Sequence, residues 1–118
     1  MDEQKRKKAL QILAQVYADA RPALVYSTAY ELLVAVILSA QCTDERVNKV
    51  TKELFKEHNT PETMLQLSRQ ELEKYIFSCG LYRSKAAHIL SASRDIVDKF
   101  GGKVPSDFAQ LKSLAGVG

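Results

Sequence analysis

The sequence has little cysteine and no long apolar run. Its only two cysteines, Cys42 and Cys79, lie far apart and form neither a metal-ligand spacing nor a disulfide framework, so we interpret both as reduced thiols of a cytosolic protein. The longest apolar run, Leu32 to Leu38, is too short to span a bilayer. The charged segment Met1 to Lys8 is typical of neither a signal peptide nor a membrane anchor.

Sustained heptads, low-complexity tracts and repeats of fixed period are also absent, which excludes a coiled coil and a solenoid. The 118 residues are 46% hydrophobic and 26% charged, as in one soluble globular domain with a real core. Seventeen basic residues against fourteen acidic ones give a net charge of +3. This mild excess permits a polyanionic partner without requiring one, and an ordinary basic surface explains it equally well.

What the sequence does contain is helical periodicity almost throughout. The apolar spacing of residues 3–17 predicts an amphipathic helix, and residues 84–100 predict a longer one that Gly101 and Gly102 stop. Five further helices are expected to begin at residues that commonly cap a helix N-terminus. These caps are Thr28, Thr43, Thr60, Ser68 and Ser106. We therefore predict an all-α fold: residues 1–118 form a single compact bundle of about seven helices.

Local signals refine this prediction. Thr28–Glu31 and Ser68–Glu71 have the pattern of capping boxes, in which the hydroxyl and the carboxylate each bind a free amide. The run 32–40 predicts a helix buried on most sides, although the β-branched residues of 33–37 leave a strand open. Gly80 is expected to end the helix that Ser68 begins. The helix over 84–100 should turn one face inward, made of Ala86, Ile89, Leu90, Ser93, Val97 and Phe100.

The first candidate site lies at residues 116–118. Here Gly116 and Gly118 flank Val117 after a short predicted helix, which leaves bare backbone amides accessible. Such amides can cradle a phosphate without any charged side chain. A helix C-cap followed by a simple turn is the alternative interpretation.

The second candidate site is the polar connection 39–44 that follows the apolar helix. A simple turn in which Thr43 or Asp44 caps the next helix would account for it. Gln41, however, offers both hydrogen-bond donors and an acceptor. It can therefore take the place of a missing base as the partner of an orphaned base on the opposite strand.

The third candidate site is the segment 80–86. Leu81 and Tyr82 follow Gly80 and precede a predicted helix, so they are expected on a loop. They could form a hydrophobic staple. Alternatively, an apolar side chain here is a wedge that enters a base stack and helps to extrude a nucleotide. Arg83 and Lys85 beside it could then contact phosphates.

In this order and spacing the segments resemble the endonuclease III family of helix-hairpin-helix DNA glycosylases. The resemblance extends from about Lys8 to Gly118. It favours the branch that acts on oxidised pyrimidines, because adenine and oxoguanine glycosylases differ around the glutamine segment. The motifs that carry it are 32–44, Val47-Asn48-Lys49, 80–86, Gly102-Lys103-Val104-Pro105 and 111–118.

This resemblance implies the greater part of a six-helix barrel domain and a role in base-excision DNA repair. Family members are bifunctional glycosylases and AP lyases, which remove oxidised pyrimidines by base flipping and Schiff-base β-elimination. The implied partner is double-stranded DNA with a damaged pyrimidine or an abasic site, and the implied location is the cytoplasm, in association with the nucleoid. No membrane partner is expected.

The resemblance also implies roles for individual residues. Gln41 would fill the vacated position and Leu81 would be the wedge, while Gly116, Val117 and Gly118 would form the phosphate-binding hairpin. Near the damaged base, Ser39, Thr43 and Asp44 would line the pocket. Ala115 stands where the family usually has proline, which loosens the turn slightly.

No catalytic residue is expected within residues 1–118, because the family's nucleophilic lysine falls about two residues beyond Gly118 and its aspartate later still. We therefore expect a domain truncated within the helix-hairpin-helix motif. The family's 4Fe–4S cysteines also lie downstream, so neither cofactor nor metal is expected in this chain. The apolar surface left exposed would favour self-association. A non-catalytic DNA-binding or protein-interaction module on the same scaffold is the alternative.

One prediction follows for the chain's chemistry. We expect the 118-residue chain to form no covalent adduct with duplex DNA bearing an abasic site when borohydride is added, because no lysine occupies the nucleophile's position. Gel electrophoresis of the trapped mixture measures this. A borohydride-dependent adduct would show that an amine within residues 1–118 attacks the sugar.

Overall fold

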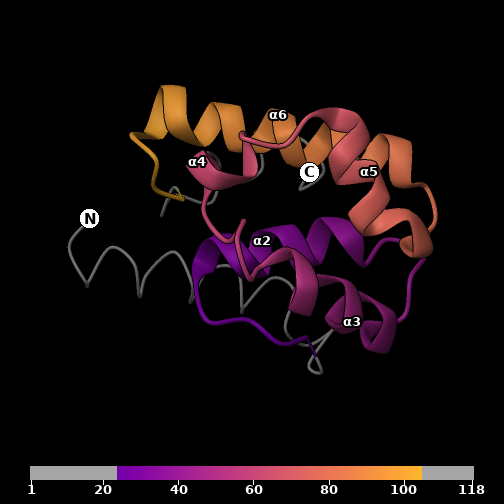
Figure 1. The fold of residues 1–118 in the computed structure, drawn as a ribbon. Coiled ribbons are helices and arrows are strands. Elements are labelled where there is room, and N and C mark those ends of the chain that lie inside the picture. Colours follow the sequence, from indigo (N-terminus) through magenta and orange to yellow (C-terminus); the bar gives the residue numbers. More distant parts are fainter. Residues whose placement is uncertain (1–23, 105–118) are drawn as a thin grey trace.

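The structure is a computed structural model that describes residues 24–104. The helices expected over 3–17 and after Ser106 lie outside the described residues, as does the expected hairpin at 116–118. The described part is entirely helical apart from its loops and turns, with no strand, so the all-α prediction is confirmed and a strand at 33–37 is wrong. Its elements are α2 (Ala29–Leu38), α3 (Asp44–Leu54), α4 (Pro61–Met64), α5 (Arg69–Ile76), the 3₁₀ helix η2 (Phe77–Cys79) and α6 (Tyr82–Phe100), shown in Figure 1.

The expected N-caps account for the starts of the first four of these α-helices. Thr28, Thr43, Thr60 and Ser68 each accept a hydrogen bond from a backbone N–H in the first turn of the helix that follows. The capping box at Ser68–Glu71 is confirmed. The box at Thr28–Glu31 is half formed: Thr28 Oγ1 accepts from Glu31 N, but the Glu31 carboxylate accepts from the N–H and hydroxyl of Ser27.

The boundary between α5 and α6 differs from the expectation. Gly80 does not end α5 directly, because α5 stops at Ile76 and η2 intervenes. Helix α6 begins at Tyr82, two residues before the expected Ser84, since the Leu81 carbonyl already accepts the helical hydrogen bond from Lys85 N at 3.0 Å. Leu81 is thus the N-cap of α6, in a left-handed conformation and without a side-chain cap.

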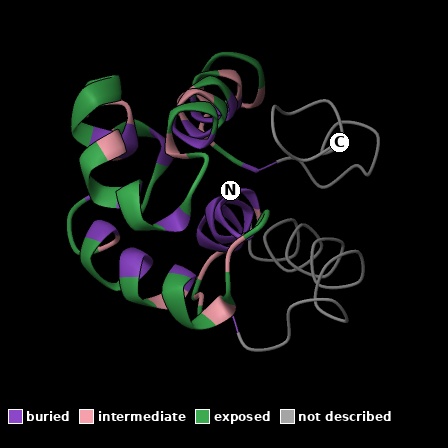
Figure 2. Cartoon of the chain, turned by 90° about the vertical axis from the view of Figure 1, so that its right-hand side faces the viewer, coloured by how far each residue is buried: buried purple, intermediate pink, exposed green. Residues whose placement is uncertain are grey.

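Helix α2 forms the centre of the described core. Nearly every residue in it is buried, and it is the helix seen end-on in purple in Figure 2. Helix α6 runs antiparallel to α2 and also packs on α4 and α5 (Figure 1). Of the six residues expected to face inward from α6, Ala86, Ile89 and Ser93 are buried, whereas the others are half-buried. Ala92 and Ile96 are buried as well, so the inward face of α6 is rotated relative to the prediction.

A buried hydrogen bond joins α2 to α6. Tyr30 Oη lies 2.6 Å from Ser93 Oγ, and Ser93 Oγ donates to the carbonyl of Ile89 at 2.7 Å. The Tyr30 hydroxyl is therefore the donor. Burial raises the pKa of Tyr30 well above its usual range, and the hydrogen bond to Ser93 opposes this shift.

Among the described residues, no helix is both long and apolar enough to cross a bilayer.

We predict that Tyr30→Phe lowers the free energy of unfolding by about 1 kcal/mol, the usual net value of one buried hydrogen bond. Ser93 keeps its bond to Ile89, so no donor is left unsatisfied. Urea denaturation measures the change, and Tyr30→Phe combined with Ser93→Ala should show coupling between the two positions. Purely additive effects would contradict an energetic contact between these hydroxyls.

Candidate nucleic-acid interface

Two connections lie at one end of the described helices. Because α2 and α6 are antiparallel, the loop 39–43 after α2 and the turn 80–81 before α6 emerge side by side (Figure 1). Helix α3 contacts η2, and the thiols of Cys42 and Cys79 are hydrogen-bonded to each other across the gap. Gln41 precedes the first cysteine and Leu81 follows the second by two residues, so the fold brings the two most specific candidate residues together.

Both candidates have a backbone conformation that their residue type rarely adopts. Gln41 has a φ of +54° and Leu81 a φ of +47°, and within residues 24–104 they are the two non-glycine residues with positive φ. This conformation costs on the order of 1 kcal/mol or more for a residue with a Cβ atom. Both side chains are exposed, Leu81 to 55% of its surface. Burial in the core therefore does not explain either conformation.

The loop after α2 is held by Ser39. Its N–H donates to the carbonyl of Ala35 at 2.9 Å and its hydroxyl to that of Val36 at 2.7 Å, while its own carbonyl accepts from Cys42 N at 3.1 Å. These bonds close a tight turn around the exposed Gln41. The next helix then starts at once, with Thr43 as its N-cap and Asp44 as its first residue. Ser39, Thr43 and Asp44 thus flank Gln41 in one short segment.

The turn before α6 is stabilised by a hydrogen bond from the buried side chain of Lys85. This side chain is only 3% exposed, and its Nζ donates to the carbonyl of Cys79 at 2.9 Å. Lys85 was expected at the surface beside Arg83, but its ammonium instead lies within the turn. Arg83 is exposed, and its guanidinium carbon lies 5.6 Å from the centre of the Tyr82 ring. The four residues predicted here therefore separate into an exposed leucine, a half-buried aromatic ring, an exposed cation and a buried cation.

Comparison with known proteins identifies this arrangement. Residues 34–117 match the model of the HhH-GPD superfamily base excision DNA repair proteins, which is more than half of the chain. The chain belongs to the HhH-GPD superfamily. The resemblance drawn from the motifs is confirmed.

Among the relatives of this HhH-GPD chain is endonuclease III of Synechocystis sp., 46% identical over 115 residues, which cover 98% of this chain and 52% of the relative. Endonuclease III of Haemophilus influenzae is 43% identical over 118 residues, covering 100% of this chain and 56% of that protein. The chain therefore spans about half the length of the curated relatives it matches.

Solved structures show the same likeness. A trapped covalent intermediate of endonuclease III with DNA, an estranged-adenine complex, superposes with a TM-score of 0.80 at 44% identity. A non-covalent endonuclease III–DNA complex gives the same values, and each match covers 100% of this chain and 55% of the other. The helices of residues 24–104 thus share the HhH-GPD fold.

The two cysteines of this HhH-GPD protein have a structural role. Burial, followed by the hydrogen bond to Cys42, raises the pKa of the Cys79 thiol to about 12, although the positive charges of Lys85 and Arg46 oppose the shift. Cys79 therefore stays protonated at neutral pH. Among residues 24–104, no cluster of His, Cys, Asp and Glu has the arrangement of a metal site.

Sequence reasoning missed two residues of this interface. Phe77 on η2 is 64% exposed, and its ring centre lies 4.8 Å from that of Tyr82. Arg46, in the first turn of α3, is exposed and its charge acts on Cys79 of the opposite turn. Neither belongs to a motif: an aromatic residue usually indicates core, and an arginine in a helix usually indicates a solvated face. Only the packing of α3 against η2 places them here.

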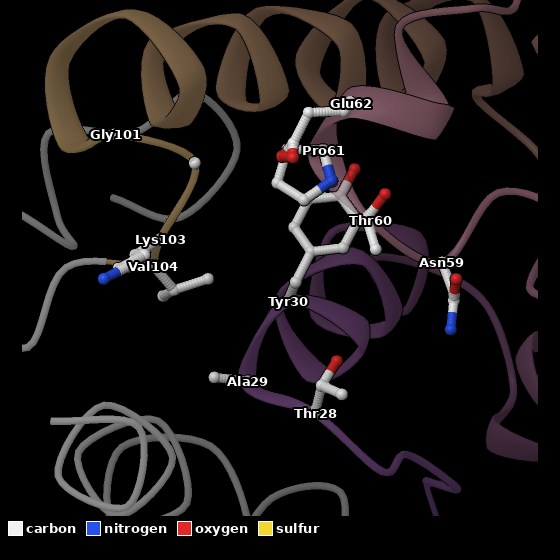
Figure 3. A pocket seen from close by; sticks show the side chains of 11 residues that line it. Thr28, Ala29, Tyr30, Asn59, Thr60, Pro61, Glu62, Gly101, Lys103 and Val104 are labelled. Atoms are coloured by element: carbon white, nitrogen blue, oxygen red, sulfur yellow. The ribbon is translucent and has the colours of Figure 1, made fainter. Parts of the chain in front are cut away.

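A hollow lies at the other end of α2, away from the loop 39–43. It has a volume of about 350 Å³ and is bounded by the start of α2, the start of α4 and the turn after α6 (Figure 3). Tyr30 and Glu62 point into it, and a Cβ atom on Gly102, whose φ is +83°, would lie 3.1 Å from Glu62 Oε1. This hollow is separated from Gln41 by the length of α2, so it is not part of the interface.

We predict that iodoacetamide at pH 8 alkylates the partly exposed Cys42 at least about 100-fold faster than Cys79, because the thiolate is the reactive form and Cys79 is buried and protonated. Mass spectrometry of timed samples measures both rates. In denaturant the two rates should become similar. Equal rates in the native chain would contradict the contact between the loops.

Proposed function

We propose that this chain supplies the nucleotide-flipping surface of an endonuclease III-type DNA glycosylase and AP lyase that acts on oxidised pyrimidines. One observation carries the proposal: Gln41 and Leu81 are exposed on adjoining loops, each with a positive φ. Burial in the core does not require either side chain to be exposed here. Opening a base stack and filling the vacated position does require two exposed side chains next to each other.

Leu81 acts as the wedge in this proposal. Its isobutyl group stands on the first turn of α6, which is anchored by the buried Cys79 and by the bond from Lys85 Nζ to the Cys79 carbonyl. Pushing an apolar side chain into stacked bases costs unstacking energy, which the protein recovers by burying that side chain. A rigid support is needed, since a mobile wedge would be displaced by restacking.

Gln41 fills the position that the extruded nucleotide leaves. Its carboxamide presents two donors and an acceptor, so it can pair with whichever base is orphaned on the opposite strand. Ser39, Thr43 and Asp44 flank it, and we assign them to the pocket for the damaged base. The substrate class is duplex DNA with an oxidised pyrimidine or an abasic site, which places the protein with the chromosomal DNA.

Contacts to phosphates hold the duplex against this surface. Arg83 on α6 and Arg46 on α3 are exposed cations, and the N-terminus of the 19-residue helix α6 adds a partial positive charge. Lys85 acts differently from Arg83: it positions the turn and does not reach a phosphate. Residues 116–118 remain the predicted phosphate-binding hairpin, outside the described part of the chain.

The described residues do not fit a 4Fe–4S cluster. They offer two free thiols, Cys42 and Cys79, which share a hydrogen bond, and Cys79 is buried and protonated. A cluster needs several cysteine thiolates. We therefore assign no metal and no catalytic residue to residues 24–104, and the lyase step belongs to residues outside them.

Substitution of the two loop residues tests the proposal. Leu81→Ala should weaken binding to a duplex with an abasic analogue about tenfold or more, because the burial of a leucine side chain is lost, and should hardly change binding to intact duplex. Gln41→Ala should weaken it by a smaller factor. Fluorescence anisotropy in low-salt buffer measures both, since the phosphate contacts weaken with salt.

Val25→Ala is the matched control. Val25 is also an exposed aliphatic residue, at 67%, but it lies on neither the loop 39–43 nor the turn 80–81: it precedes α2, and its N–H donates to Asn48 Oδ1 of α3. Its substitution should leave both affinities unchanged. The proposal fails if the unaltered chain shows no preference for the abasic duplex, or if Leu81→Ala and Val25→Ala have the same effect.

A further inference from the structure

We propose that Phe77 and Tyr82 form a stacking site for the unpaired nucleobase that remains in the strand opposite the extruded nucleotide. This inference rests on the proposed function and deepens it. Leu81 opens the base stack and Gln41 offers hydrogen bonds, but neither side chain has an aromatic surface on which the orphaned base can stack. The two aromatic rings beside Leu81 provide that surface.

The exposure of Phe77 is the first observation. Its side chain is 64% exposed, although phenylalanine ordinarily buries most of its surface. Within residues 24–104 the exposed large hydrophobic residues are Val25, Tyr75, Phe77 and Leu81. Two of these, Phe77 on η2 and Leu81 at the start of α6, lie four residues apart, on either side of the buried Cys79. The apolar surface is thus concentrated where the duplex would be opened.

The rings are also held in place. Tyr82 is the first residue of α6 and is half-buried against the core, and its ring centre lies 4.8 Å from that of Phe77 at an interplanar angle of 44°. Phe77 begins η2, and this short helix is fixed by the buried Cys79. Ordered rings lose little conformational freedom when a base stacks on them, which favours binding.

Charge next to the rings completes the site. The guanidinium carbon of Arg83 lies 5.6 Å from the centre of the Tyr82 ring, and a shallow hollow of about 290 Å³ is lined by Leu81, Tyr82, Arg83 and Ser84. The wedge, the rings and a cation therefore form one continuous surface. A nucleotide has an aromatic face and an adjoining phosphate, so its chemistry complements this combination better than that of an apolar protein segment does.

Paired DNA probes test the site. The first duplex carries a tetrahydrofuran abasic analogue opposite adenine, and the second carries the analogue at both positions of the pair, so that no base is orphaned. In the 118-residue chain Phe77→Ala should weaken binding to the first duplex about 5- to 100-fold and to the second less than about twofold. Phe77→Trp should retain the affinity of the unaltered chain, since it keeps an aromatic face.

Three further variants make the test decisive. Phe77→Leu keeps an apolar side chain without an aromatic face and should lose the preference as Phe77→Ala does, even if the alanine variant folds poorly. Tyr75→Ala removes an exposed aromatic residue whose ring contacts His58 instead, and it should bind both duplexes normally. Leu81→Ala should weaken both complexes, because the wedge enters the stack in either duplex.

The outcomes separate the two proposals. If the unaltered chain prefers abasic over intact duplex but Phe77→Ala binds both probes normally, or loses affinity equally for both, the stacking site is wrong and the proposed function stands. A change in self-association by light scattering, with unchanged DNA affinity, would assign Phe77 to a second copy of the chain and also overturn the site. No preference for abasic duplex in the unaltered chain overturns both.

Discussion

The antiparallel packing of α6 against the buried helix α2 is the constraint on which the interface depends. Because the two helices run in opposite directions, the end of α2 and the start of α6 meet at one end of the bundle (Figure 1). The hydrogen bond between Tyr30 and Ser93 joins the first turn of α2 to the second half of α6. Gln41 and Leu81, 40 residues apart in the sequence, become neighbours only through this packing.

The interface also shows where stability is given up. Within residues 24–104, Gln41 and Leu81 have a positive φ, and Phe77 on η2 and Leu81 before α6 are exposed although both are large and apolar. Each feature opposes folding slightly, and the surrounding structure compensates through buried contacts: the two cysteines between the loops, Ser39 within the first loop and Lys85 behind the second. Strain of this kind persists only where neighbouring contacts hold it, which is typical of functional sites.

The sequence predicts the helices well because their starts are local chemistry. Thr43, Thr60 and Ser68 cap the helices expected of them, since a hydroxyl three residues before a free amide needs no distant partner. The start of α6 is predicted poorly for the same reason. Leu81 caps that helix through its backbone conformation alone, and no side-chain signal marks it, so Ser84 is the more obvious candidate.

The candidate site is predicted in part. Gln41, Leu81 and Tyr82 are found from motifs, whereas the roles of Lys85 and Phe77 depend on tertiary contacts. A lysine close to an arginine is usually a surface cation, yet Lys85 is buried, and its ammonium donates a hydrogen bond to the carbonyl of Cys79 within the turn. A phenylalanine ordinarily belongs to the core, and only the way η2 meets α6 leaves Phe77 outside it.

The positive φ of Leu81 also restricts which apolar side chains can occupy that position. Valine and isoleucine are hydrophobic like leucine, but because they branch at Cβ, a left-handed backbone conformation such as that of Leu81 is a severe outlier for them. Leucine branches at Cγ, so its Cβ carries a single heavy-atom substituent and crowds the backbone less. The backbone conformation therefore restricts the shape of the side chain at this position as well as its hydrophobicity. Leu81→Ile, although it keeps the number of carbon atoms, should be a poorer replacement than Leu81→Met.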